Sequence, residues 1–412
     1  MLTTLSRSLL YAAFFFLPLT FIKLFSNFTL SDLLLVLAFI TLAISKSGRK
    51  FISDTVILKN EFLIPLFIFS IGFFLSLENS HVPMDSITAF MQIIFIFVIA
   101  YPVLVEVVKN EEQVRKIALM LIIPGIVISV LMIMIKIIGM NLGIDLLARE
   151  GWRGRTSYGG MEPNIPGRII LQNVPLVAVF AITALKNSTR LLAILLIVVQ
   201  LTAILLTSSR SNFVTFILGA MLFWYLSVKF GRKIKFTHAA YATMLVVIVL
   251  AIFYSINPEF FISPFERYKT ILNAQKSASS MERLRVIDMG FIYLNKNPLI
   301  GMGLGSSFLY TKVNLHNPIL LTWLENGILG TIGFTSLYIV LMVQGLRAYR
   351  DRFIGSYMLL ALTIVMVMMI FGDMFMANSY KRVLWVPALL FMAYSKNLSA
   401  ENSKRVEYAE EH

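Results

Sequence analysis

The chain contains no cysteine among its 412 residues, which excludes disulfide bonds, thiol chemistry and cysteine-ligated metal sites. Charged residues are scarce, at 14%, and histidine occurs only four times, without any cluster. No pair of acidic residues resembles a clamp for a metal-bound nucleotide. We therefore expect neither a metal nor another cofactor.

Apolar residues, by contrast, are abundant. They make up 58% of the chain and give a mean hydropathy of +0.80, whereas a soluble domain is about 45–50% apolar. Long apolar stretches recur along the sequence, and most could cross a hydrocarbon core of roughly 30 Å. The sequence thus predicts an all-α, polytopic protein with a single integral membrane domain over 1–412, surrounded by the lipid bilayer.

Hydropathy predicts about twelve transmembrane helices, with a short last one and a short gap at 208–211 that could instead be a bend within one helix. The first apolar stretch has no small-residue cleavage site after it, so we interpret it as a span and not as a signal peptide. The predicted spans are 9–25, 31–45, 61–78, 87–108, 117–139, 169–185, 191–207, 212–229, 238–255, 319–345, 355–372 and 383–395.

Basic loops orient these spans. They follow every second predicted span, so all of them lie on one side, and short basic loops are typical of the cytoplasmic side. Both termini, including the tail 396–412, are then cytoplasmic, and the large loop 256–318 is periplasmic. The basic loops are 46–50, 109–116, 186–190, 229–235 and 347–352.

The net charge of +14 would suggest nucleic acid as a partner in a soluble protein, but these loops explain most of it, so we expect no nucleic-acid partner. The remaining cations are unexpected, because they lie on the predicted outer side. They could be plain surface charge or could bind an anionic ligand. They are Arg149, Arg153, Arg155, Arg168, Arg210, Arg267, Arg283 and Arg285.

Arg210 lies between two predicted spans in "LLTSSRSNF", with no acid within four residues. An arginine close to a membrane is costly and is often functional, although it could also snorkel to the interface. The neighbouring serines could cap the next helix and leave the guanidinium available for a ligand.

Residues 281–294 have the apolar spacing of an amphipathic helix that lies on the outer membrane surface. Arg285 has Glu282 and Asp288 three residues away on either side, and such pairs form on helices. Arg283 has no acid at these offsets. Arg283 is therefore the better candidate for ligand binding, and Arg285 for a structural role.

Three further features lie on the predicted outer side. Arg155 sits in a turn-rich loop in which Glu162 could pair with it.

The glycines of 297–308 could bind phosphate through their backbone amides. However, no strand precedes them and the sequence patterns of nucleotide-binding loops are absent, so we interpret this segment as a tight loop. His316, at the start of a predicted span, titrates in a range that suits proton transfer, although a lone histidine is often only a surface residue.

The chain resembles the O-antigen ligase / O-antigen polymerase superfamily of bacterial envelope proteins. The resemblance is strongest over 150–335, and four stretches carry it. They are "RTSYGG…PN" (155–164), "LTSSRSNFVTFILG" (206–219), "ERLRVIDMGFIYLNKNPLIGMGLGSSF" (282–308) and "LHNPILLTWLENGILG" (315–330). One departure is Ser211, where relatives often have glycine or alanine.

This resemblance implies a metal-independent, GT-C-like membrane glycosyltransferase of the bacterial inner membrane with a periplasmic active site. The donor would be a glycan on undecaprenyl pyrophosphate, and the acceptor lipid A–core oligosaccharide for a ligase or another glycan for a polymerase. The family's functional residues fall on Arg210, Arg283 and His316 as catalytic groups. Arg155 and Asn317 would join the arginines in binding the pyrophosphate or glycan.

Two other readings compete with an enzyme. A transporter of lipid-linked sugars would also have many spans and buried cations, but inverted repeats and charges near the midplane are typical of transporters, and the sequence shows neither. A structural or regulatory membrane partner would tolerate changes at Arg210 and His316. The sequence favours a ligase slightly over a polymerase, and leaves the oligomeric state and the sugars open.

Overall fold

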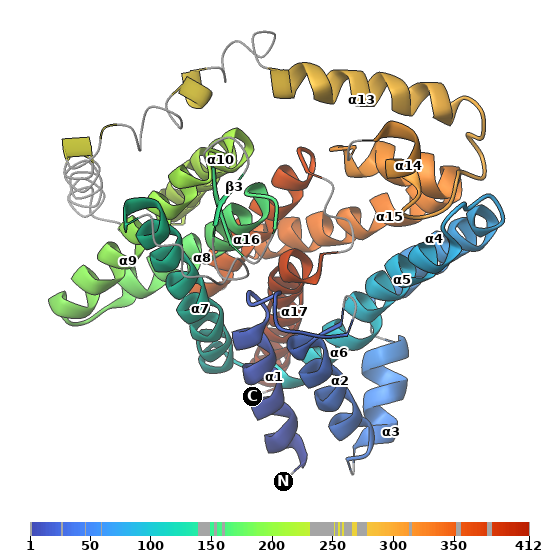
Figure 1. Cartoon of the computed structure of the whole chain (residues 1–412). Helices are drawn as coiled ribbons and strands as arrows, with labels where there is room; N and C mark the ends of the chain where they lie inside the picture. Colours follow the sequence, from blue (N-terminus) through green and yellow to red (C-terminus); the bar gives the residue numbers. More distant parts are fainter. Residues whose placement is uncertain are drawn as a thin grey trace.

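The structure is a computed structural model, and it is almost entirely helical (Figure 1). It describes residues 2–25, 28–45, 47–58, 60–138, 149–151, 155–158, 161–230, 278–312, 315–351, 356–376 and 381–411, with short pieces at 251, 254–255, 258 and 266–269.

The first helices form a hairpin. α1 (Leu2–Phe16) ends before Pro18, and the short strands β1 (Lys23–Phe25) and β2 (Phe28–Thr29) lead into α2 (Leu30–Ala43). α2 begins at Thr29 because the hydroxyl of this residue accepts a hydrogen bond from Asp32 N, and the Asp32 carboxylate accepts one in return from Thr29 N. A short helix α3 (Gly48–Lys50) then runs into the π-helical segment η1 (Phe51–Leu58).

The middle of the chain supplies most of the long helices. In chain order they are α4 (Leu63–Leu77), α5 (Pro83–Ile94) continued by η2 (Phe95–Ala100) and α6 (Tyr101–Val107), α7 (Glu111–Ile138), α8 (Asn164–Thr183), α9 (Asn187–Leu206) and α10 (Arg210–Lys229). Between α7 and α8, strands β3 (Arg149–Gly151) and β4 (Arg155–Ser157) pair as a small antiparallel hairpin.

The last described elements are α13 (Ala278–Leu294), α14 (Ser307–Thr311), α15 (Pro318–Arg350), α16 (Tyr357–Asp373) and α17 (Arg382–Glu411). In Figure 1, α13, α14 and the start of α15 lie at one end of the bundle, and both termini lie toward the opposite end. α13, which belongs to the predicted loop 256–318, therefore lies at the other end of the bundle from the termini.

By length and composition, six of the described helices could cross a membrane, or seven if the pair α2 and 48–57, bent by 117°, counts as one span. This confirms an all-α polytopic membrane protein but not the predicted number of twelve. α1, α4 and α16 are apolar but shorter. The predicted ninth span, 238–255, lies largely outside the described residues.

The predicted bounds of the first span were wrong. The first helix covers 2–16 and not 9–25, since Pro18 cannot continue a helix and the chain turns into β1. The last helix does not stop near residue 395 but continues to Glu411, so the predicted tail 396–412 is helical over nearly all of its length. The α3–η1 segment was not predicted at all.

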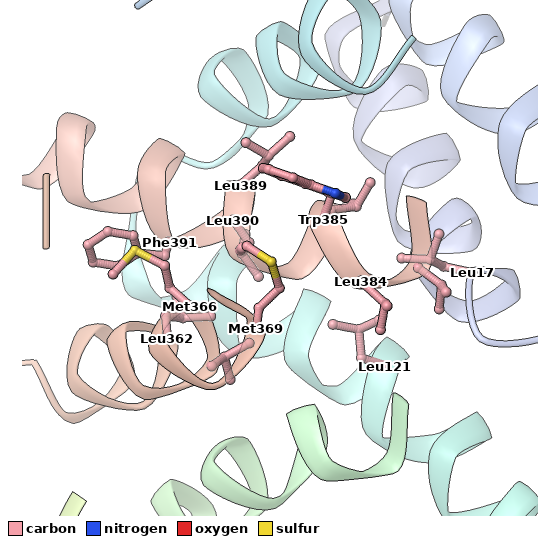
Figure 2. Packing of buried hydrophobic residues seen from close by; sticks show 14 of the residues in the cluster. Leu17, Leu121, Leu362, Met366, Met369, Leu384, Trp385, Leu389, Leu390 and Phe391 are labelled. Carbon is pink, nitrogen blue, oxygen red and sulfur yellow. The ribbon is translucent and has the colours of Figure 1, made fainter. Parts of the chain in front are cut away.

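The apolar core surrounds α16 and α17, which are buried along most of their length up to Tyr394. Figure 2 shows Trp385 and Leu389 of α17 among leucines and methionines from the neighbouring helices. α4 and α15 pack very closely, because Gly72 faces Gly330 and a Cβ on Gly72 would come within 2.2 Å of the Gly330 nitrogen. Small residues allow such close approach of membrane helices.

Candidate active site

Arg210 is the first residue of α10. The chain turns sharply there because Ser208 has a positive φ of 49°. Ser209 then caps the helix, and its hydroxyl accepts a hydrogen bond from Asn212 N at 3.4 Å. The structure therefore confirms that a serine caps this helix.

Arg210 also connects two distant parts of the chain. Its Nη2 donates a hydrogen bond to Ser280 Oγ of α13 at 3.0 Å. Arg283, one turn further along α13, is close enough for its positive charge to repel that of Arg210. Two of the predicted site arginines thus lie together, although 73 residues separate 210 from 283 in the sequence.

α13 directs Arg283 and Arg285 differently. Arg283 is half-buried on the same side as the buried residues Val286 and Gly290, whereas Arg285 is exposed. The predicted ion pairs of Arg285 were wrong, since within the described part of α13 its side chain makes no ion pair with Glu282 or Asp288. The distinction between the two arginines therefore rests on which side of the helix they occupy.

His316 lies just before α15 and is half-buried, with its Nδ1 enclosed and without a hydrogen-bond partner among the described residues. Burial lowers the pKa of His316 to about 4, and the positive charge of Arg283 adds to this decrease, whereas Glu162 opposes it. The imidazole is therefore neutral near pH 7 and able to accept a proton, beside an arginine that can bind an anion.

Asn317 follows His316 and caps α15. Its Oδ1 accepts hydrogen bonds from Ile319 N at 3.0 Å and from Leu320 N at 2.9 Å. This cap fixes the backbone next to His316. The side-chain Nδ2 donates no hydrogen bond to any described residue, so it can still donate one to a ligand.

The glycine-rich segment is a tight loop, as predicted, and several of its amides donate hydrogen bonds to other protein groups. α15 breaks at Gly327, with φ 63° and ψ −167°, which leaves backbone carbonyls without helical partners. Met302 N donates to Leu324 O at 3.0 Å, and Gly303 N donates to Glu325 O at 2.8 Å. Since irregular backbone at membrane depth must be satisfied by protein, this pairing holds the start of α15, and with it His316, against the loop.

Glu162 is a carboxylate that acts on several of these groups. It lies in the exposed loop before α8 and accepts a hydrogen bond from Asn164 Nδ2. Its negative charge acts on Arg283, His316 and Lys381. The sequence suggested Glu162 only as a partner for Arg155.

Lys381 is a further cation near these groups that the sequence did not single out. It precedes α17, and Glu162 reaches its ammonium electrostatically. The signal that could have identified it is the basic pair "KR" at 381–382, which lies on a predicted outer loop. Its neighbour Arg382 instead forms an ion pair with Asp32, with 2.7 Å between Nε and Oδ1.

The structure settles the place of one more predicted outer arginine, Arg168, but does not describe the side chains of Arg155 and Arg153. The backbone of Arg155 is in β4, but its side chain lies outside what the structure describes, and so does Arg153. Arg168, considered above as a possible anion ligand, is fully buried within the bundle. Its Nη1 lies 3.3 Å from Asp373 Oδ1, and its Nη2 donates to Gly372 O at 2.7 Å. Because Asp373 neutralises it, Arg168 is a structural residue and not an anion ligand.

Electrostatic effects connect described residues from four predicted outer loops: Glu162 from 140–168, Arg210 from 208–211, Arg283 and His316 from 256–318, and Lys381 from 373–382. Cations outnumber the carboxylate, and the histidine is neutral, so the group favours a polyanion. Within the described ranges, no three histidine or acidic side chains gather in a way that could hold a metal ion.

One comparison with known proteins found a match. Residues 191–335 match a protein family described as O-antigen ligase. This segment contains Arg210, Arg283 and His316. No curated protein matches the chain.

Proposed function

We propose that the protein is an O-antigen ligase-type glycosyltransferase, because residues 191–335 match a family described as O-antigen ligase. It moves a glycan from undecaprenyl pyrophosphate to a sugar of lipid A–core at the periplasmic face of the inner membrane. The observation that best supports this proposal is the position of His316. Its imidazole is neutral, its Nδ1 has no hydrogen-bond partner among the described residues, and it lies near the cations Arg283 and Arg210.

The arginines bind the pyrophosphate. A guanidinium presents several donors in a planar fork and forms charge-assisted hydrogen bonds with phosphate oxygens. Arg210 and Arg283 repel each other in the free protein, and a bound polyanion would replace this repulsion with attraction to both. The bound pyrophosphate thus offsets the unfavourable repulsion between the two arginines.

His316 accepts the proton of the acceptor sugar. The hydroxyl oxygen attacks the anomeric carbon of the donor glycan, and the bond from that carbon to the phosphate oxygen breaks. The bonding electrons leave with undecaprenyl pyrophosphate, and the hydroxyl proton passes to His316. A single direct displacement of this kind inverts the anomeric configuration.

The site needs no metal for this reaction, because the cations supply the charge that a divalent ion would otherwise provide. The positive charges of Arg210, Arg283 and Lys381 also repel a divalent cation from the same place. The leaving group is already activated as a pyrophosphate, so stabilisation of its developing charge and removal of one proton are sufficient.

The proposed orientation places this site in the periplasm and both termini in the cytoplasm. It is supported by the basic loops on alternate sides and by the position of α13 at the end of the bundle opposite the termini (Figure 1). Tags inserted beside Arg49 and at the C-terminus should report cytoplasm, whereas a tag near Gln275 should report periplasm. A cytoplasmic signal at Gln275 would invert the orientation.

The alternative is a polymerase that uses the same donor but another glycan as acceptor. The two are distinguished by the glycan that accumulates when the gene is deleted. Lipid A–core without attached polymer indicates a ligase, whereas lipid A–core that carries a single repeat unit indicates a polymerase. Normal glycan would contradict both, and an accumulation of donor on the cytoplasmic side would indicate a transporter.

A further inference from the structure

We propose that Asn212 is a positioning residue, which holds Arg210 in place for the pyrophosphate through buried hydrogen bonds between α10 and α8. This inference rests on the proposed function, in which Arg210 binds the donor. The side chain of Asn212 has no exposed surface, so it does not touch the donor and acts through Arg210.

Asn212 lies in the first turn of α10, two residues after Arg210. Its Nδ2 donates a hydrogen bond at 2.9 Å to the carbonyl oxygen of Asn164, the first residue of α8. Its Oδ1 accepts a hydrogen bond at 3.4 Å from Nε of Arg168, one turn further along α8. One side chain thus joins the starts of two helices that lie side by side in Figure 1.

The two partners of Asn212 fix the orientation of its amide. A guanidinium can only donate hydrogen bonds and a backbone carbonyl can only accept them, so Oδ1 must face Arg168 and Nδ2 must face Asn164. Arg168 is itself held by Asp373 and by Gly372 O. A leucine at position 212 would have a similar size but would leave both buried partners without their hydrogen bonds.

Gly167 brings α8 against both ends of the turn that presents Arg210. A Cβ on Gly167 would come within 2.4 Å of Asn212 Nδ2 and within 3.1 Å of Thr207 Oγ1. Thr207 precedes the turn at Ser208, and Asn212 follows it. α8 therefore contacts this turn on either side of Arg210, and the contact leaves the turn little space to shift.

Arg210 has two reasons to need this support. Ser208, two residues before it, has a φ of 49°, a conformation that residues other than glycine rarely adopt. Arg210 also lies close enough to Arg283 for the two positive charges to repel each other. Ser280 holds the guanidinium of Arg210 by a hydrogen bond, and Asn212 holds the backbone that carries it. A donor group that is already in position binds an anion without a further cost of ordering.

A double-mutant cycle between positions 212 and 210 tests this role. Binding of inorganic pyrophosphate is measured with the purified full-length protein in nanodiscs. Asn212→Leu should weaken binding about 10-fold, because Arg210 no longer directs its charge-assisted hydrogen bonds at the anion. In the Arg210→Ala background, where Arg283 remains to bind pyrophosphate, Asn212→Leu should change the affinity by less than about 2-fold, since nothing is left to position.

Thr215→Val is the matched control. Thr215 is also buried on α10, and its hydroxyl donates a hydrogen bond at 2.7 Å to Ser211 O of the same helix. This variant should therefore bind pyrophosphate as the unchanged protein does. Asn212→Ser is a second variant with a smaller effect on folding, because its hydroxyl can still face Arg168 but is too short to reach both partners. It should weaken binding in the same direction while the thermal midpoint stays close to that of the unchanged protein.

Unchanged affinity in both Asn212 variants would overturn the proposal. An equal loss of affinity with and without Arg210→Ala would also overturn it, because it would show a general structural role that does not depend on Arg210. Wild-type protein that binds pyrophosphate but transfers no glycan would contradict the proposed function alone. Wild-type protein that binds no pyrophosphate would contradict both.

Discussion

Arg210 Nη2 donates a hydrogen bond to Ser280 Oγ at 3.0 Å, and this contact joins the start of α10 to the start of α13. It places Arg210 beside Arg283, whose side chain lies one turn along α13. Two cations that repel each other are held at one end of a membrane bundle, which is the arrangement expected before a polyanionic ligand binds.

Comparison of the two α13 arginines tests which side of this helix faces the site. Arg283→Ala should lower glycan transfer by about 10²–10³-fold, because it removes a donor directed at the developing charge. Arg285→Ala should change the rate by no more than about 2-fold, as is usual for an exposed residue. Arg283→Lys should rescue poorly, since an ammonium lacks the planar fork.

Both alanine variants must be present in the membrane at equal levels for this comparison. If Arg285→Ala is inactive while Arg283→Ala transfers glycan normally, α13 faces the site with its other side.

The pH dependence of transfer tests the role of His316. Its pKa is about 4 in the free protein because of burial and the charge of Arg283, so kcat/KM should show no loss from His316 protonation above about pH 5. The bound pyrophosphate adds negative charge, which favours the imidazolium and raises the pKa of His316. The acid limb of kcat should therefore lie at higher pH than that of kcat/KM.

His316→Asn should remove the acid limb of kcat and lower the rate by about 10²–10⁴-fold. An acid limb of kcat that persists in this variant at the same pH would assign the titration to another group.

The negative charge of Glu162 should weaken binding of the donor, and it should make His316 a better proton acceptor because it raises the pKa of His316. Glu162→Gln keeps an oxygen that can accept from Asn164 Nδ2 but removes the negative charge. The KM for the donor should fall, because repulsion of the pyrophosphate is lost, and the acid limb of kcat should move to lower pH, because Glu162 raises the pKa of His316. Asp288→Asn, an exposed change on α13, serves as the control. A higher KM in Glu162→Gln would contradict this role.

The buried pair of Arg168 and Asp373 should be structural. Both side chains are nearly inaccessible, and Asp373 Oδ2 also accepts a hydrogen bond from Tyr338 at 3.1 Å. Arg168→Met leaves Asp373 as an uncompensated buried charge and should cost about 3–5 kcal/mol of stability. The double change Arg168→Met with Asp373→Leu should recover much of that loss, as measured by thermal unfolding in detergent. Equal destabilisation in the single and double variants would show that the charge is not the cause.

The sequence predicted those features that depend on near neighbours. Apolar runs predicted the helices, Ser209 was recognised as a possible cap, and the spacing along α13 predicted a helix on which Arg283 and Arg285 differ. Helix ends were less accurate, because Pro18 stopped α1 early and the polar residues after Tyr394 continued α17.

The remaining features depend on contacts between distant residues. Arg168 lies 205 residues from Asp373 in the sequence, so nothing near Arg168 revealed that it is neutralised. The break of α15 at Gly327 is stabilised by Met302 and Gly303, which donate to its freed carbonyls from a distant part of the sequence. The negative charge of Glu162 acts on Arg283, His316 and Lys381, which are far from it in the sequence. The spacing of residues along the chain could not predict this.

Glycan transfer by the purified protein in nanodiscs tests the central claim most directly. The assay contains an undecaprenyl-pyrophosphate-linked glycan, lipid A–core and EDTA, and it measures both the glycosylated product and released undecaprenyl pyrophosphate. The account predicts that both form in equal amounts with EDTA present, and that His316→Asn and Arg283→Ala nearly abolish them. Transfer that stops with EDTA and returns with one divalent ion, or that survives in both variants, would contradict it.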